Sequence, residues 1–292
     1  EGDLVVSEYR ADYSFDGSLH ESYQYEVRGS DTYRSLNRIF ATPVSSTPSE
    51  KAHVTLLSSS VPQRTLAYLK DYAGVVHMKE GDDTAKKLIQ ERAQNNEAGA
   101  LNPGYFDPGE WDISYSWKLT PPIERGSDAD HLNIDLATEH IPYSGITITI
   151  PAEGVLKVYP HPVSLQVTRT DDQYILTGTA SADVPLGFEL VLQRGFGDGM
   201  AGEVQDLGQV SISQMAGDAN PWYSSLLAEF PRFTFFVGIF MLILIPPLLF
   251  VIWYRKGREK PFTVPEHLSV IPDSSLKPWM VSLIFAGDPE TL

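Results

Sequence analysis

One apolar segment, from Phe233 to Trp253, limits what this chain can fold into more than any other part of its sequence. The segment carries no charged side chain, and as a helix rising ~1.5 Å per residue it would be roughly 32 Å long. The hydrocarbon core of a bilayer is about 30 Å thick, so the segment predicts one transmembrane α-helix over residues 233–253. The rest of the chain is thereby divided between the two sides of a membrane.

The residues that flank the segment predict its orientation in a cell membrane. Arg255, Lys256, Arg258 and Lys260 form a basic cluster, and such clusters mark the cytoplasmic side. Residues 1–232 should therefore be extracellular, and the C-terminus should be cytoplasmic. Aromatic and basic side chains concentrate where a helix meets the lipid headgroups. The predicted membrane-interface residues are Trp222, Tyr223, Phe230, Arg232, Trp253, Tyr254, Arg255 and Lys256.

Two adjacent prolines, Pro246 and Pro247, lie inside the apolar segment and predict a kink there. Each proline removes a backbone donor, and the carbonyl groups released by a kink are better tolerated against protein than against lipid. Two interpretations stay open: a bend without consequence, or a helix that packs against another membrane helix of its own or of a partner chain.

Residues 1–220 read as a β-rich ectodomain, and residues 221–232 as a juxtamembrane segment. Trp111 to Leu119 alternates apolar and polar residues, as half-buried strands do, and short strands of this kind recur from Gly145 to Leu192. The spacing favours an all-β fold of sandwich type, with a seam near residues 120–144 if it forms two modules. A last strand is predicted at Val210 to Ile212, within a glycine-rich, acidic loop over residues 195–220.

One short helix is predicted outside the membrane, where Asp82 and Asp83 open a stretch whose apolar residues share one face. Beyond the membrane, residues 254–292 are proline-rich and read as an extended cytoplasmic segment. This segment ends soon after the apolar run Met280 to Ala286, so we expect the natural polypeptide to continue.

Composition narrows the classes of partner. The formal net charge is −16, and the segment after Arg232 contains equal numbers of acidic and basic residues, so the excess of negative charge lies on the outer part. A surface of this kind repels nucleic acid, which argues against nucleic-acid binding. The chain has no cysteine, so the ectodomain must be stable without disulfides.

A few side chains could bind a metal ion. His131 and His140, together with Asp130, form a group of types that hold zinc or another divalent ion. Their spacing matches no established ligand pattern, and an acidic loop followed by an ordinary strand explains the same residues. No catalytic motif is present, and no cofactor is expected. Trp111, Tyr115 and Trp117 recur at strand spacing. Such aromatic residues are mostly core residues, but as an exposed row they could bind a glycan.

Several stretches in fixed order resemble a known family. They are Tyr13 to Tyr25 (YSFDGSLHESYQY), Asn96 to Phe106 (NEAGALNPGYF), Pro121 to Glu124 (PPIE), His131 to Tyr143 (HLNIDLATEHIPY), Val158 to Val163 (VYPHPV) and Ile271 to Ile284 (IPDSSLKPWMVSLI). Together with the membrane segment, they resemble the archaeal branch of the membrane proteins classed as the domain of unknown function 2207 family. The resemblance implies a secreted β-rich domain, a membrane helix and a cytoplasmic continuation, and it implies no catalytic residues.

Three functions remain open from the sequence. The first is a non-enzymatic, membrane-anchored surface protein whose ectodomain serves protein interaction, scaffolding or assembly, in contact with lipid and with a protein partner or a second copy. The second is an extracellular ligand-binding, glycan-binding or sensor module that signals through the helix. The third is a metal-dependent hydrolase that uses the region of His131 and His140.

Overall fold

A computed structural model describes residues 2–221 and 224–257, without the side chains of residues 224–232. The chain divides into two compact units, Glu1–Arg232 and Phe233–Leu292, which are described separately. Strands are the main secondary structure of the first unit, as the sequence predicts, and among the described residues one apolar helix that could span a membrane belongs to the C-terminal part.

Seventeen strands are assigned within the described residues, together with two short α-helices and one 3₁₀ turn outside the membrane segment. The strands are β1 (Leu4–Tyr13), β2 (Ser18–Val27), β3 (Ser35–Ile39), β4 (Val44–Ser45), β5 (Val54–Ser60), β6 (Leu66–Lys70), β7 (Val76–Met78), β8 (Glu97–Leu101), β9 (Gly109–Leu119), β10 (Ile123–Arg125), β11 (Ala129–Ala137), β12 (Tyr143–Pro151), β13 (Val155–His161), β14 (Gln166–Arg169), β15 (Gln173–Ala180), β16 (Leu186–Gln193) and β17 (Val204–Asp206). The helices are α1 (Asp83–Arg92), the 3₁₀ turn η1 (Phe196–Gly199) and α2 (Ile212–Ala219).

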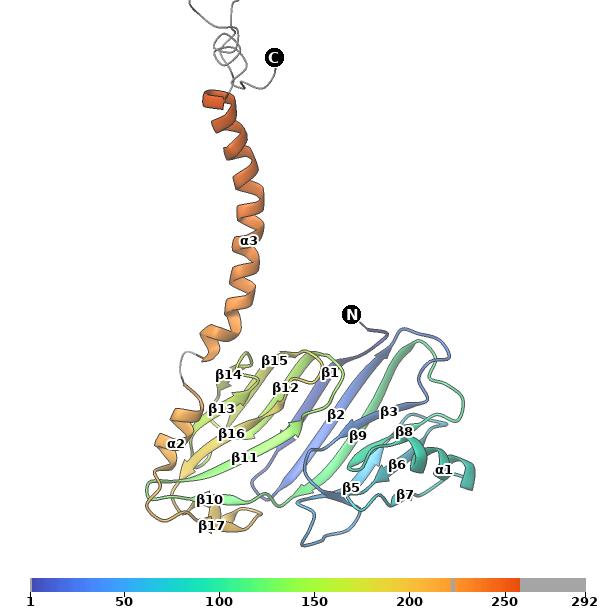
Figure 1. The fold of residues 1–292 in the computed structure, drawn as a ribbon. Coiled ribbons are helices and arrows are strands. Elements are labelled where there is room, and N and C mark those ends of the chain that lie inside the picture. The colour runs from blue at the N-terminus through green and yellow to red at the C-terminus, as the bar shows by residue number, and fades with distance from the viewer. Residues whose placement is uncertain (1, 222–223, 258–292) are drawn as a thin grey trace, which may run out of the picture. The chain divides into compact units, whose positions relative to one another are not determined.

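These strands form three sheets in the described part of the chain. The eight-stranded sheet has the order β14-β15-β12-β1-β2-β9-β5-β4, the five-stranded sheet β13-β16-β11-β10-β17, and the four-stranded sheet β3-β8-β6-β7. The four-stranded sheet lies over the β2–β9–β5 side of the large sheet, and the five-stranded sheet over its β1–β12 side (Figure 1). One face of the large sheet is therefore covered by two smaller sheets.

The core lies between the large sheet and the two smaller ones. Alternation puts Tyr9, Tyr23 and Trp117 on the same buried face, where each is at most 1% exposed. One apolar cluster joins these side chains to Leu36 of the four-stranded sheet and Leu190 of the five-stranded sheet. Tyr115 is also buried, so β9 supplies aromatic residues to the core and not an exposed row for a glycan.

Residues on both sides of the predicted seam at 120–144 share this core. β1 pairs with β12 in parallel, with Tyr9 opposite Ile146, and β15 continues the same sheet. The middle of the seam itself forms β11, whose Leu132 and Ile134 are buried in the common cluster. This arrangement favours one module over two.

Three local predictions need correction. The strand predicted at Val210 to Ile212 is wrong, because α2 begins at Ile212 and the last strand of the unit is Val204–Asp206. The start of α2 is stabilised from a distance, since the Asp128 carboxylate accepts the backbone N–H of Ile212 at 2.8 Å. Consequently the 195–220 region is not all loop, and α1 is not the only short helix of the first unit.

A strand that the sequence analysis missed, β8, follows α1. Its five residues are all buried, but Ala98, Gly99 and Ala100 lack the branched or aromatic side chains that favour strands. Small residues are needed there, because a Cβ on Gly99 would lie 2.6 Å from the Tyr68 hydroxyl. The α1 helix itself is confirmed, with the Asp82 side chain accepting the N–H of Ala85 at 2.8 Å.

The C-terminal part contains α3 (Ser224–Ile252), which is followed by a π-helical turn, η2 (Trp253–Gly257). Within Phe233–Gly257, an 18-residue window has a mean hydropathy of 2.8, and none of that window is buried in the described part of the chain, so its length and composition suit a membrane span. The α-helical assignment continues through Pro246 and Pro247, so the kink stays a prediction.

The predicted interface residues divide into three groups. Trp222 and Tyr223 lie outside the described residues, and Phe230 and Arg232 lie in α3, where only the backbone is described. The remaining four belong to η2 and are exposed: Trp253, Tyr254, Arg255 and Lys256.

Candidate functional site

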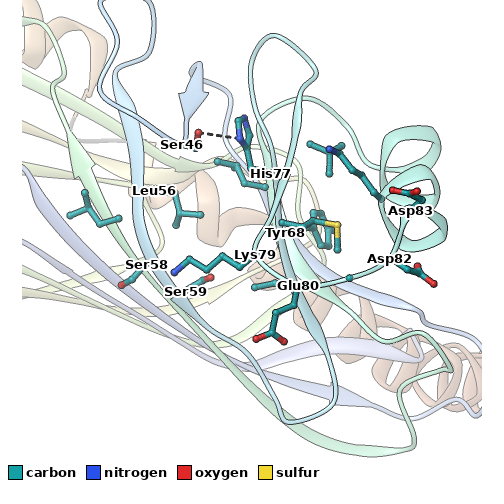
Figure 2. A pocket seen from close by; sticks show the side chains of 17 residues that line it. Ser46, Leu56, Ser58, Ser59, Tyr68, His77, Lys79, Glu80, Asp82 and Asp83 are labelled. Carbon is teal, nitrogen blue, oxygen red and sulfur yellow. Dashed lines mark hydrogen bonds between the residues drawn. The ribbon is translucent and has the colours of Figure 1, made fainter.

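An open groove of about 600 Å³ lies between β5 and the β6–β7 hairpin. Figure 2 shows Leu56, Ser58 and Ser59 from β5, and Tyr68 and His77 from the hairpin, around this groove. The loop before α1 and the first turn of the helix complete its lining. The groove therefore lies between strands of two different sheets.

The edge of β5 is largely unpaired along this groove. One side of β5 pairs with β9, but the other side meets only β4, through Val44 and Ser45 opposite Val54 and Thr55. Within the described residues, Leu56–Ser60 therefore has no strand partner on its outer edge. The register with β9 shifts between Leu56 and Ser58, and Leu57 at this irregularity is 59% exposed. An unpaired strand edge offers rows of backbone donors and acceptors to another chain.

A histidine on the opposite side of the groove is held by an acidic partner. Nε2 of His77 contacts Oδ2 of Asp71 at 2.7 Å, and Nδ1 lies 3.3 Å from the Ser46 hydroxyl. Although burial raises the pKa of Asp71, hydrogen bonds from His77 and from the N–H groups of Val75 and Ala73 keep that pKa below its usual value. The hairpin wall of the groove is thus fixed by an ionised carboxylate.

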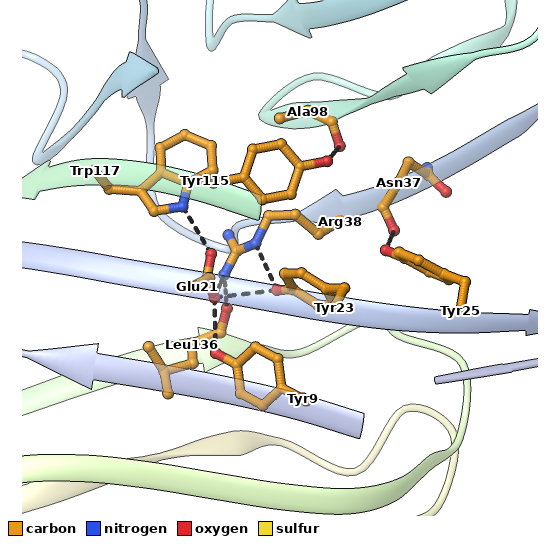
Figure 3. A network of polar contacts seen from close by, with 10 residues as sticks. All are labelled: Tyr9, Glu21, Tyr23, Tyr25, Asn37, Arg38, Ala98, Tyr115, Trp117 and Leu136. Atoms are coloured by element: carbon orange, nitrogen blue, oxygen red, sulfur yellow. Dashed lines mark hydrogen bonds and ion pairs between the residues drawn. The ribbon is translucent and has the colours of Figure 1, made fainter. Parts of the chain in front are cut away.

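A polar network lies at the centre of the core (Figure 3). One oxygen of the Glu21 carboxylate accepts hydrogen bonds from the Tyr9 hydroxyl at 2.7 Å, the Tyr23 hydroxyl at 3.0 Å and Nη2 of Arg38 at 2.8 Å. The other oxygen accepts a hydrogen bond from Nε1 of Trp117 at 2.7 Å. The Glu21 and Arg38 side chains are 0% and 1% exposed.

The Arg38 guanidinium connects all three sheets. Arg38 lies on β3, its ion pair reaches Glu21 on β2, and Nη2 also donates to the Leu136 carbonyl of β11 at 2.5 Å. Its face stacks on Phe40, with 3.1 Å from the guanidinium carbon to the ring centroid. The network is enclosed by the core, so we assign it to stability and not to ligand binding.

His131, one of the predicted metal ligands, is held between two carboxylates. Nδ1 lies 2.8 Å from Glu124 and Nε2 lies 2.8 Å from Glu189. Ionised carboxylates only accept hydrogen bonds, so both ring nitrogens must donate and the ring is an imidazolium. Burial lowers the pKa of His131, but hydrogen bonds and charge from Glu189 and Glu124 outweigh burial and raise it.

Glu189 extends this cluster to two further elements. Its second oxygen accepts a hydrogen bond at 2.6 Å from Nδ2 of Asn220, which follows α2. The same oxygen lies 3.7 Å from Nε2 of His161 at the end of β13. Burial raises the pKa of Glu189, but His131, His161 and Asn220 together lower it to about 2. His161 is the last residue of β13, so this cluster connects β11, β13, β16 and the end of α2.

The other two predicted metal ligands have separate partners. Asp130 is fully buried and accepts two hydrogen bonds from Arg125, at 2.8 and 2.9 Å, and the N–H groups of Gly195 and Gly197. His140 contacts the carbonyls of Ile141 and Val184, both at 2.6 Å, and stacks on Tyr143. His131, His140 and Asp130 therefore do not form one ligand set. Across residues 2–221 and 224–257, no cluster of three such side chains is arranged to hold a metal.

Glu124 and Glu189 were not predicted from the sequence, although Glu189 could have been noticed. It is the only charged residue of β16, whose other residues except the last are apolar and buried. A carboxylate in such a strand needs a partner, because an unpaired buried charge is strongly unfavourable. Its partner on β11 could not be identified without the register of the strands.

A second cavity, of about 320 Å³, lies beside this cluster. Its lining comes from the segment after β3, the junction of β9 with β10, the start of β5, and β11. The lining residues are Phe40, Thr42, His53, Val54, Leu119, Pro121, Pro122, Glu124, His131, Asn133, Ile134 and Asp135. This cavity combines apolar walls with a few polar groups, as binding sites for small molecules do.

Comparison with solved structures gives distant likenesses, among them the following three. A putative protease from Parabacteroides distasonis is 12% identical, with a TM-score of 0.33 over 66% of this chain and 41% of that chain. Legionella pneumophila aminopeptidase A is 11% identical, with a TM-score of 0.33 over 66% and 22%. Native yeast LTA4 hydrolase is 9% identical, with a TM-score of 0.36 over 65% and 29%.

The chain thus spans less than half the length of these three proteins, and at such scores the likeness carries no conclusion about activity. No curated protein matches the chain. The family comparison is more informative, and it agrees with the resemblance noted in the sequence. Residues 5–191 match the model described as predicted membrane protein (DUF2207) N-terminal domain, so the chain belongs to this family.

Proposed function

We propose that this protein is a membrane-anchored surface protein that acts by protein interaction, with residues 1–232 extracellular and the C-terminus cytoplasmic. The family description and the apolar helix support the anchoring. The basic residues Arg255 and Lys256 at the end of α3 support the orientation, because positive charge favours the cytoplasmic side. The sequence stretches noted above support the archaeal branch of the family.

The unpaired edge of β5 is the observation that carries this function. Proteins commonly recognise an extended segment of a partner by adding it to an exposed sheet edge, so that main-chain hydrogen bonds give affinity and nearby pockets give specificity. Leu56–Ser60 provides such an edge, and the groove beside it has room for the side chains of the added strand. We therefore assign the groove to an extended segment of a partner protein.

The membrane helix supplies a second contact in the same proposal. Pro246 and Pro247 leave two carbonyl groups of α3 without backbone donors, and a neighbouring helix can satisfy such groups where lipid cannot. The ectodomain would then bind partner subunits outside the membrane, and the helix would bind them within it. This is a scaffolding role and requires no chemistry of the protein itself.

The experiment is purification of the tagged full chain from its native membranes after mild cross-linking. Leu57→Lys puts a charge at the exposed irregularity of β5, and we expect partner recovery to fall at least tenfold. The matched control is Leu156→Lys on β13, which is similarly exposed, at 54%, but does not line the groove. Equal recovery with both variants, when near-ultraviolet circular dichroism shows both to be folded, would refute the assignment of the groove.

A second candidate function is binding of a small extracellular ligand, and the 320 Å³ cavity beside His131 specifically favours it. This candidate is compatible with the first, since a bound ligand can report its presence to a membrane complex. The metal-dependent hydrolase gains no support from the positions of His131 and His140, and elemental analysis of the purified protein tests it directly.

A further inference from the structure

The cavity beside His131 has an apolar base. Phe40, Val54, Leu119 and Ile134 contribute to its walls, and each of these side chains is at most 4% exposed. Its volume of about 320 Å³ lies at the lower end of the range for ligand sites, roughly 300–1,000 Å³. A cavity of this size suits a small apolar body better than a peptide.

The charges around the cavity are unbalanced. Among the described residues no lysine or arginine lines it, whereas two carboxylates, Glu124 and Asp135, and the imidazolium of His131 do. Glu124 is already paired with His131. Asp135 on β11 is exposed, and within the described residues its carboxylate has no hydrogen bond or ion pair. The guanidinium of Arg38 stacks on Phe40 from within the core, but that charge is neutralised by Glu21.

We propose that this cavity binds a small organic cation, with an apolar body against Phe40, Val54 and Ile134 and an ammonium group at the Asp135 carboxylate. A hydrogen bond between two charged groups is stronger than one between neutral groups, so the amine is favoured over an alcohol of the same shape. An organic carboxylate is disfavoured, since it would meet Asp135, while the His131 imidazolium of the lining already donates both of its N–H groups to Glu124 and Glu189.

Three probes that share a phenyl ring and differ in charge test the proposal. They are phenethylammonium, 2-phenylethanol and 3-phenylpropanoate, titrated into the full chain in detergent and followed by saturation-transfer nuclear magnetic resonance. We expect the cation to bind at least tenfold more tightly than the alcohol and the anion to bind least. Equal affinity for the three probes, or no saturable binding of the cation, would overturn the proposal.

Two substitutions localise the binding. Asp135→Asn should remove the preference for the cation, whereas Asp112→Asn on β9, also exposed but outside the cavity, should leave it unchanged. Asn133→Trp places a large ring at an exposed position of the lining and should abolish binding of both the cation and the alcohol. If Asp135→Asn binds the cation as the parent protein does, the ammonium site is not at this carboxylate and the inference fails.

Discussion

Replacing Glu21 by glutamine should destabilise the first unit, Glu1–Arg232, by about 3–5 kcal/mol, the loss measured when one partner of a buried ion pair is removed. Arg38 would remain a buried cation with no carboxylate beside it. The glutamine amide cannot restore the network in either orientation. Glu21 accepts hydrogen bonds at both oxygens, and the new NH₂ group would replace one of them. It would then face either the Trp117 donor or the three donors Tyr9, Tyr23 and Arg38, depending on the orientation of the amide.

Thermal unfolding of the full chain in detergent, followed by near-ultraviolet circular dichroism at pH 7, measures this loss. In a domain of 150–250 residues, 1 kcal/mol shifts Tm by roughly 2–4 °C, so Glu21→Gln should lower Tm by about 6–20 °C. Glu26→Gln on the same strand is the matched control, because Glu26 forms an exposed pair with Arg28 at 2.9 Å. Exposed pairs contribute little to stability, so this control should leave Tm nearly unchanged.

If Glu21→Gln and Glu26→Gln lower Tm equally, the central network does not hold the sheets together and the reasoning is refuted. The number of unfolding transitions is a second test of the network. Arg38 reaches Leu136 of the five-stranded sheet, so both small sheets should separate from the large one in a single transition. Two resolved transitions would contradict the common core.

Two further predictions concern His131 and the membrane helix. The pKa of His131 is raised in the folded protein, so the stability that its protonation contributes is complete below its unfolded pKa of about 6.5 and is lost as pH rises through the folded value. His131→Gln should abolish this part of the pH dependence, as measured by denaturant unfolding between pH 5 and 9. An unchanged pH profile would contradict the assignment of an imidazolium. Replacing Pro246 and Pro247 together by leucine should weaken association with a neighbouring membrane helix, as measured by co-purification in mild detergent, and unchanged association would leave the prolines as a simple bend.

Local patterns predicted most of the fold. Alternation over Trp111 to Leu119 identified β9, and Asp82 identified the start of α1, because period and capping are properties of neighbouring residues. β8 was missed since its small residues are required by the Tyr68 ring packed above Gly99, which no local pattern reveals. The start of α2 was also missed, although its N-cap is a local signal, since the Ser211 hydroxyl accepts the N–H of Gln214; only the additional acceptor, Asp128, comes from a distant turn.

The candidate sites were harder to predict, because each depends on which strands are neighbours. His131 and Asp130 are adjacent in sequence, yet alternation points them to opposite faces of β11, where one meets Glu189 and the other Arg125. The sequence placed them in one metal-binding group because it contained no information on these partners. Alternation along β11 puts the two side chains on opposite faces, and the register of β11 against β16 and β10 then identifies the partners of each.

The polar groups of the first unit differ in whether they already have hydrogen-bond partners, and this difference indicates where binding is expected. Glu21, Asp130 and Glu189 are each surrounded by donors, so a ligand that reached them would have to displace hydrogen bonds that stabilise the fold. The outer edge of Leu56–Ser60 and the Asp135 carboxylate, in contrast, have no such partners within the described residues. A partner strand or a cation can bind there without disrupting any intramolecular contact. Binding is therefore expected at these open groups, even though the buried clusters contain more of the residue types usually associated with chemistry.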